Sequence, residues 1–181
     1  VFVAPAVVVA TGASWRRLNV DDEAKYMGKG VHFCPHCDGP FYKGKNVAVV
    51  GGGNSGIEAA IDLAGICKHV TVLEFADTLR ADTVLQDKAA SMSNIEIFKS
   101  SQTTQVLGDG NHVTAIRVKD RNTEEEREIA VDGIFVQIGL APNTDSFRDA
   151  LPLNQRREIE VDAGCRTAVP GVYAAGDCTS V

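Results

Sequence analysis

The segment 32–40, HFCPHCDGP, holds two cysteines three positions apart and an aspartate directly after the second. Cysteines at this spacing can exchange electrons, because one thiolate attacks a partner disulfide and the other resolves the mixed disulfide. Asp38 could give or take the proton that this exchange moves. Cys34, Cys37 and Asp38 are therefore the candidate catalytic residues.

A zinc site is the alternative for the same segment. Structural zinc takes four ligands, and the chain has no second Cys-x-x-Cys or histidine pair to complete a set. His32 and His36 could do so only by crowding four ligands into six residues. Cys67, Cys165 and Cys178 stand singly, and we expect small buried apolar residues or bystanders there. We therefore expect no bound metal, and elemental analysis would decide the alternative.

The second motif, GGGNSG, has the spacing G-x-G-x-x-G between a predicted strand and a predicted helix. The first glycine allows a tight turn, the third lets backbone amides approach a pyrophosphate, and the last lets the helix pack closely on the strand. The N-terminus of the helix would stabilise the anion. A glycine-rich turn without a ligand is the alternative. The predicted dinucleotide-binding residues are Gly51, Gly52, Gly53, Asn54, Ser55 and Gly56.

Glu74 follows the next predicted strand, close to the spacing at which an acid accepts hydrogen bonds from the adenine-side ribose. Its carboxylate would repel a 2′-phosphate, so we expect NADH to be preferred to NADPH. Phe75, Ala76 and Asp77 supply no cation after the strand, and Arg80 is the nearest one along the chain. The alternative is that Glu74 is only a polar strand end.

The residues around the glycine turn and Glu74 predict an α/β fold. The runs 46–50 and 69–75 are apolar and predict strands, and 57–67 predicts a helix between them. A right-handed crossover would place Val47–Val50 beside Val70–Leu73 in a parallel sheet. The fold class is therefore a Rossmann-like dinucleotide-binding domain with a parallel sheet.

The rest of the chain predicts further elements around this unit. We expect a helix at 81–92, a strand at 95–98, and an antiparallel β-meander over 103–139. The apolar run 5–12 predicts a buried strand, and 13–30 is polar and irregular, as in a connector. A last strand is predicted in GVYAAGDCT, near the carboxyl end.

Composition limits the function. The net charge of -6 and the pI near 5.2 argue against nucleic-acid binding, which needs a clustered basic face. No apolar run approaches the roughly 20 residues that span a bilayer. Five cysteines in a chain of this size favour a reducing compartment, and we expect the cytoplasm. The chain begins inside an apolar strand, so we expect a fragment of a longer protein.

Taken together, the segments ATGA, CPHCDGP, GGGNSGIEAA and GVYAAGDCT resemble those of the thioredoxin-reductase-like flavoproteins. Within them, CPHCDG and IFVQIGLAPNT are most similar to the flavoprotein subunits of bacterial alkyl hydroperoxide reductases. The likeness covers essentially all 181 residues. It implies an NAD(H)-binding domain at 15–138 that carries the cysteines and is inserted into a flavin domain, with parts of the FAD domain at 1–14 and 139–181.

The resemblance also assigns cofactor contacts. Thr11, Gly12, Gly176 and Asp177 match the flavin-contacting stretches, and Gly139 is added to the cofactor-binding set. The flavin domain's own amino-terminal G-x-G-x-x-G and the helix after GDCTSV are missing, so we expect this chain not to hold FAD tightly. The thioredoxin-like domains of the hydroperoxide reductase flavoprotein are missing too.

An electron path is implied by the same resemblance. NADH would reduce FAD, the flavin would reduce the disulfide, and an amino-terminal dithiol would pass the electrons to the peroxiredoxin subunit of the system. Cys37 would be the thiol nearer the flavin and Cys34 the exchanging one. The intact protein would be a homodimer, and the insert would rotate about linkers near 13–16 and 138–142. A thioredoxin reductase is the near alternative, and an NADH-binding module without activity is the distant one.

Overall fold

The computed structural model describes residues 4–180. The chain divides into two compact units, one formed by Arg16–Gly139 and the other by Val1–Trp15 with Leu140–Val181. Across the described residues no helix reaches the length and hydropathy that crossing a bilayer requires.

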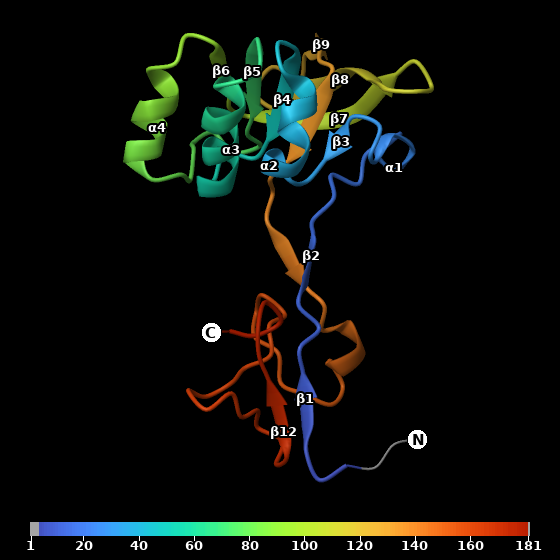
Figure 1. Cartoon of the computed structure of the whole chain (residues 1–181), viewed down its shortest axis with the longest axis vertical. Helices are drawn as coiled ribbons and strands as arrows, with labels where there is room; N and C mark the ends of the chain where they lie inside the picture. The colour runs from blue at the N-terminus through green and yellow to red at the C-terminus, as the bar shows by residue number, and fades with distance from the viewer. Residues whose placement is uncertain (1–3, 181) are drawn as a thin grey trace. The chain divides into compact units, whose positions relative to one another are not determined.

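The unit Arg16–Gly139 is built on a parallel sheet whose strands are ordered β3, β10, β4, β5 and β6 (Figure 1). Their register places Val47–Val50 directly beside Val70–Leu73, which confirms the predicted parallel pairing. Every neighbouring pair in this sheet is parallel. The strands are β3 (Val31–His32), β4 (Asn46–Val50), β5 (His69–Leu73), β6 (Ile95–Phe98) and β10 (Gly133–Val136).

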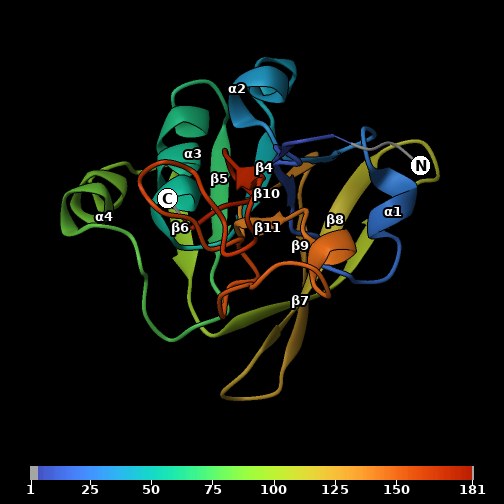
Figure 2. The ribbon, with the colours of Figure 1, turned by 90° about the horizontal axis from the view of Figure 1, so that it is seen from below.

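Two helices, α3 (Asn54–Ala64) and α4 (Thr83–Ala90), pack on one face of this sheet (Figures 1 and 2). Ile57, Ala60 and Leu63 recur at helical spacing in α3 and are fully or almost fully buried against the strands. Helix α4 is shorter than the predicted 81–92, beginning and ending two residues inside that range. These helices form the first of the unit's two cores.

An antiparallel sheet covers the other face. Its strands are β7 (Ser101–Gly108), β8 (Val113–Asp120) and β9 (Glu126–Ala130), paired in sequence order (Figure 2). The prediction of a meander is correct for these three strands and wrong for β10. That strand leaves the meander and inserts between β3 and β4, where all four of its residues are buried. A run buried on both faces fits a central parallel strand better than an exposed meander.

The expectation of an irregular connector at 13–30 is only partly correct. This stretch contains β2 (Ala13–Trp15) and the short helix α1 (Glu23–Tyr26). Tyr26 is 1% exposed within the second core, and Glu23 is buried because its carboxylate accepts backbone N–H groups. The polar composition of this stretch therefore gave no sign that Glu23 and Tyr26 are buried. Two further short elements, α2 (Pro35–Asp38) and η1 (Gly39–Tyr42), follow β3.

The other unit contains two two-stranded sheets. Strand β1 (Val7–Val9) pairs in parallel with β12 (Val172–Ala174), and β2 pairs antiparallel with β11 (Leu140–Pro142). A 3-10 turn, η2 (Asp145–Phe147), follows β11, and the described part of this unit has no α-helix. Its small core consists of Val9, Leu151, Ile159, Ala174 and Cys178.

Candidate redox and nucleotide-binding site

Four strands of the parallel sheet deliver candidate residues to the same edge. Cys34 follows β3, Gly51 follows β4, Glu74 follows β5, and Gly139 lies three residues beyond β10. Because parallel strands all end at one edge, their following loops meet there, and ligands of open α/β sheets bind at that edge. The sheet therefore brings the cysteine loop and the glycine turn to one side of the Arg16–Gly139 unit.

Gly51 and Gly56 occupy positions where a side chain does not fit. Gly51 has φ of 122°, and a Cβ there would overlap the backbone oxygen of Gln137. A Cβ on Gly56 would overlap the backbone oxygen of Gly51, so the first turn of α3 packs directly on the strand end. At Gly53 a Cβ would meet nothing within 4 Å. The space beside Gly53 is open to a ligand, as expected where a backbone approaches a phosphate.

The carboxylate of Glu74 is held over this turn. Its Oε2 accepts the backbone N–H of Gly52 at 2.5 Å, and its Oε1 accepts that of Ala76 at 2.8 Å. The side chain is half-buried, so it is fixed while part of it faces the cavity. Its expected hydrogen bonds to a ribose stay a prediction.

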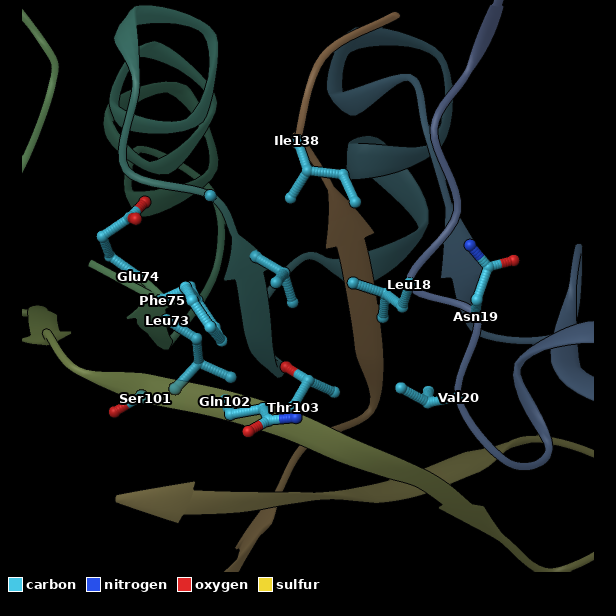
Figure 3. Close-up of a pocket in the computed structure, with 12 residues that line it drawn as sticks. Leu18, Asn19, Val20, Leu73, Glu74, Phe75, Ser101, Gln102, Thr103 and Ile138 are labelled. Carbon is cyan, nitrogen blue, oxygen red and sulfur yellow. The ribbon is translucent and has the colours of Figure 1, made fainter. Parts of the chain in front are cut away.

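Two adjoining cavities follow the turn. One, of about 410 Å³, is lined by the glycine turn with Asn54 and Ser55, by 74–76 and Arg80, and by Gln137–Gly139. The other, of about 380 Å³, lies between the sheet edge and β7: Ser101, Gln102 and Thr103 lie along β7 on one side and Ile138 on the opposite side (Figure 3). Gly51, Glu74, Phe75 and Ile138 line both. Each volume is within the range of ligand pockets, and the open glycine backbone with an acid beside it fits a dinucleotide.

The cysteine loop is closed by a disulfide between Cys34 and Cys37. Cys34 is the N-cap residue of α2, Pro35 occupies the first turn, and the backbone N–H of Cys37 donates to Cys34 Sγ at 3.2 Å. Cys37 is exposed and Cys34 is half-buried. Exposure within this unit therefore does not single out Cys34 as the exchanging thiol, and that assignment stays a prediction.

Asp38 does not stand alone beside the cysteines. Its Oδ2 lies 3.2 Å from Nδ1 of His32, and Nε2 of that ring lies 2.7 Å from the hydroxyl of Tyr42. Burial, followed by the charges of Asp38 and Asp132, raises the pKa of Tyr42 above its ordinary value. The sequence named His32 only as a possible zinc ligand and did not identify Tyr42.

His36 is the exposed spacer of the motif. Its side chain is 81% exposed and lies 3.7 Å from the carboxylate of Asp62. Within residues 4–180, no group of three or more histidine, cysteine or acidic side chains is arranged to hold a metal ion.

The residues that the resemblance assigns to flavin lie in the other unit. Thr11 and Gly12 follow β1, and Gly176 and Asp177 follow β12, so the parallel pair brings both stretches to its carboxyl edge. Asn143, which the sequence analysis did not identify, holds the first stretch. Its Nδ2 donates to the backbone oxygen of Thr11, and the Thr11 hydroxyl donates to the backbone oxygen of Asn143.

Two further residues at the sheet edge were missed. Gln137 is 8% exposed and donates from Nε2 to the backbone oxygen of Phe33, which ties β10 to the residue before Cys34. Arg121 comes from the turn between β8 and β9, lies 3.8 Å from the ring centroid of Phe75 and donates to its backbone oxygen. Arg80 is therefore not the only cation near the end of β5.

Comparison with known proteins agrees with this arrangement. The chain is 58% identical over 178 residues to the F subunit of alkyl hydroperoxide reductase in Pseudomonas putida, covering 98% of this chain and 34% of that protein. The corresponding protein of Staphylococcus aureus strain MRSA252 is 58% identical over 173 residues. The chain thus spans about a third of the length of these relatives, 34% of each.

Solved structures and a family comparison extend the likeness. The thioredoxin reductase of T. acidophilum matches with a TM-score of 0.88 and 41% identity, covering 97% of this chain and 58% of that one. That of Lactococcus lactis matches with a TM-score of 0.89 and 32% identity over the same shares. The α/β fold class, with its parallel sheet and meander, is confirmed. The family described as pyridine nucleotide-disulphide oxidoreductase matches residues 2–181. The chain therefore belongs to the pyridine nucleotide-disulphide oxidoreductase family.

Proposed function

We propose that this chain is part of an NADH-dependent flavoprotein that reduces the Cys34–Cys37 disulfide and passes the electrons to the peroxiredoxin subunit of an alkyl hydroperoxide reductase. One observation carries the proposal: one sheet edge holds both a glycine turn shaped for a dinucleotide and a disulfide beside an acid. The names of the curated relatives support the choice of system. Delivery to the peroxiredoxin, a homodimeric intact protein and a cytoplasmic location are parts of the same proposal.

Each candidate site residue of the Arg16–Gly139 unit has a defined task in this proposal. The backbone of Gly51–Gly56 and the N-terminus of α3 bind the pyrophosphate, and Glu74 binds the adenine-side ribose. When bound, the nicotinamide and the flavin supply the electron pair. Cys34 and Cys37 accept two electrons and two protons as their disulfide opens to two thiols, and Asp38 delivers one of these protons.

The flavin is assigned to the other unit. Thr11, Gly12, Gly176 and Asp177 would contact it at the carboxyl edge of the β1–β12 pair. In the described part of this unit, however, no α-helix offers an N-terminus to a second pyrophosphate. These residues fit only part of an FAD site, and we expect the chain by itself to bind FAD weakly.

NADH is proposed rather than NADPH because of charge. A 2′-phosphate would bring about two negative charges against Glu74, and at a separation of about 4 Å and an effective dielectric near 20 each like-charge pair costs on the order of 4 kcal/mol before screening. Arg121, engaged with Phe75, and exposed Arg80 reduce this cost. A quarter of one such pair still gives several-fold discrimination, since about 1.4 kcal/mol is tenfold in affinity.

The test is titration of NADH and NADPH against the wild-type chain and Glu74→Ala. We expect NADH to bind at least several-fold more tightly to the wild type, and the preference to shrink in the variant. Glu96→Ala, which removes a carboxylate from β6, is the matched control and should leave the preference unchanged. Equal wild-type affinities, or a preference that Glu74→Ala leaves intact, would show that Glu74 is not the selector.

A thioredoxin reductase is the second candidate, and the solved structures favour it. The two candidates share the nucleotide turn and the disulfide and differ in the protein that accepts the electrons. Assay of the intact protein with a peroxiredoxin and with a thioredoxin as acceptors distinguishes them. Faster reduction of thioredoxin would overturn the assignment to the hydroperoxide reductase system.

A further inference from the structure

The ring of His32 bridges two groups of the dithiol site. It stands at the end of β3, where its side chain is 12% exposed. Nδ1 faces the Asp38 carboxylate at 3.2 Å, and Nε2 faces the Tyr42 hydroxyl at 2.7 Å. Both ring nitrogens are therefore engaged, each with a different neighbouring element.

The His32 ring is held in place by two aromatic neighbours. It stacks on Phe135, its register partner in β10, with centroids 5.6 Å apart and an interplanar angle of 30°. The ring of Tyr42 lies edge-on to both, at 5.4 Å from His32 and 5.5 Å from Phe135. Gly133 makes room for Tyr42, because a Cβ there would overlap the tyrosine ring. Rigid support of this kind is what a site residue needs to hold a partner within a fraction of an ångström.

The partners also define the proton positions. An ionised Asp38 carboxylate only accepts hydrogen bonds, so a contact with Nδ1 requires the hydrogen on that nitrogen. In a neutral ring Nε2 is then an acceptor, and the Tyr42 hydroxyl donates to it. Burial raises the pKa of Tyr42, so its hydroxyl keeps the proton that it donates. The hydrogen bonds thus run from Tyr42 through His32 to Asp38.

We infer that His32 is a positioning residue of the dithiol site: its Nδ1–H fixes the Asp38 carboxylate next to Cys37, and Tyr42 fixes the ring from the other side. The inference rests on the proposed redox role of Cys34 and Cys37 with Asp38 as their acid. His32 lies outside the Cys-x-x-Cys motif, so the motif alone gives it no role.

The first test follows thiol exchange in the reduced chain, using an aromatic disulfide that releases a coloured thiolate. Every protein compared carries Cys165→Ala, because exposed Cys165 would release a coloured thiolate of its own. One cysteine thiolate attacks the reagent and releases the first coloured thiolate. The second cysteine attacks the resulting mixed disulfide, releases the second and closes the Cys34–Cys37 bond. The two thiol protons pass to water, one of them by way of Asp38. The rate of the closing step is the quantity compared.

Two variants separate positioning from packing, because both lose the ring that stacks on Phe135. His32→Gln should slow closure about tenfold, the cost of one hydrogen bond to a charged group. His32→Asn, whose amide can occupy the place of Nδ1, should stay within about threefold of the wild type. In an Asp38→Asn background, His32→Gln should cause no further slowing. His69→Gln, at a half-exposed histidine of β5, is the control and should match the wild type.

Equal slowing by His32→Gln and His32→Asn, or effects of His32→Gln and Asp38→Asn that multiply, would overturn the inference. A second measurement needs no variant: imidazole nitrogen shifts in the NMR spectrum should identify the Nδ1-protonated tautomer of His32. An Nε2-protonated neutral ring would contradict it. A chain with His32 in place that never releases the second thiolate would contradict the proposed function instead, and the tautomer would then decide only whether Nδ1 of His32 donates to Asp38.

Discussion

The glycine turn and the cysteine loop lie at the same sheet edge, but the first depends on backbone atoms and the second on side chains. The turn at Gly51–Gly56 is made of backbone, and its shape depends on side chains being absent. The cysteine loop depends on side chains being present: Asp38, His32 and Tyr42 come from three successive elements and are joined by hydrogen bonds.

This difference determines how each region should fail. A side chain added at Gly51 or Gly56 meets backbone atoms, which cannot move aside, so the fold is damaged together with nucleotide binding. A polar atom removed from the cysteine loop leaves the backbone in place, so chemistry should be lost before stability. Substitutions in the two regions should therefore differ in what they damage.

The largest effect is expected within the turn itself. Gly51→Ala forces a side chain into φ of 122° and against Gln137, and should lower the free energy of unfolding by about 3 kcal/mol or more. Gly53→Ala is the matched control, because φ there is -83° and the space is open. It should cost about 1 kcal/mol or less as a changed N-cap residue, yet weaken NADH binding. Chemical denaturation measures the stability of each variant, and NADH titration measures its affinity. Equal destabilisation by Gly51→Ala and Gly53→Ala would contradict the claim that the shape of the turn depends on the missing side chain at Gly51.

The next prediction concerns a buried thiol at the other end of α3 from the turn. Cys67, just past α3, is 6% exposed, and burial raises its pKa to about 11 from 9.0. A raised pKa means stability that is fully present below the unfolded value and is lost as pH rises through the folded one. Wild-type stability should fall by on the order of 2–3 kcal/mol over this alkaline window, beyond the fall in Cys67→Ala. Cys165→Ala, at an exposed thiol, is the control and should follow the wild type.

Parallel pH curves for the wild type and Cys67→Ala would contradict the burial of this thiol. They would also weaken the contrast between a buried, inert cysteine and the exposed Cys37.

The smallest effect is expected in the network. Tyr42→Phe removes one hydrogen bond to His32 and should lower stability by about 1 kcal/mol at neutral pH. Because the pKa of Tyr42 is raised, the advantage of the tyrosine is complete below 10.0 and is lost as pH rises through the higher folded value. Denaturation of both proteins as a function of pH measures the gap, and a gap that widens at alkaline pH would contradict this account.

The two regions also differ in how well the sequence predicts them. The turn at Gly51–Gly56 and the adjacent strands β4 and β5 follow from local spacing, because their geometry depends on neighbours in sequence. Contacts such as Gln137 with Phe33 join residues from distant elements and leave no local pattern. The same limit explains why β10 was assigned to the meander, since only the tertiary structure places it between β3 and β4.

A count of reactive thiols in the native chain tests directly whether Cys34 and Cys37 are a reversible redox pair. After reduction, Cys34, Cys37 and Cys165 should react, while Cys67 and Cys178 stay protected by burial. Mild oxidation should remove two of these thiols and leave Cys165, and renewed reduction should restore them. If Cys34→Ser leaves the loss of two thiols unchanged, the pair is not the redox site.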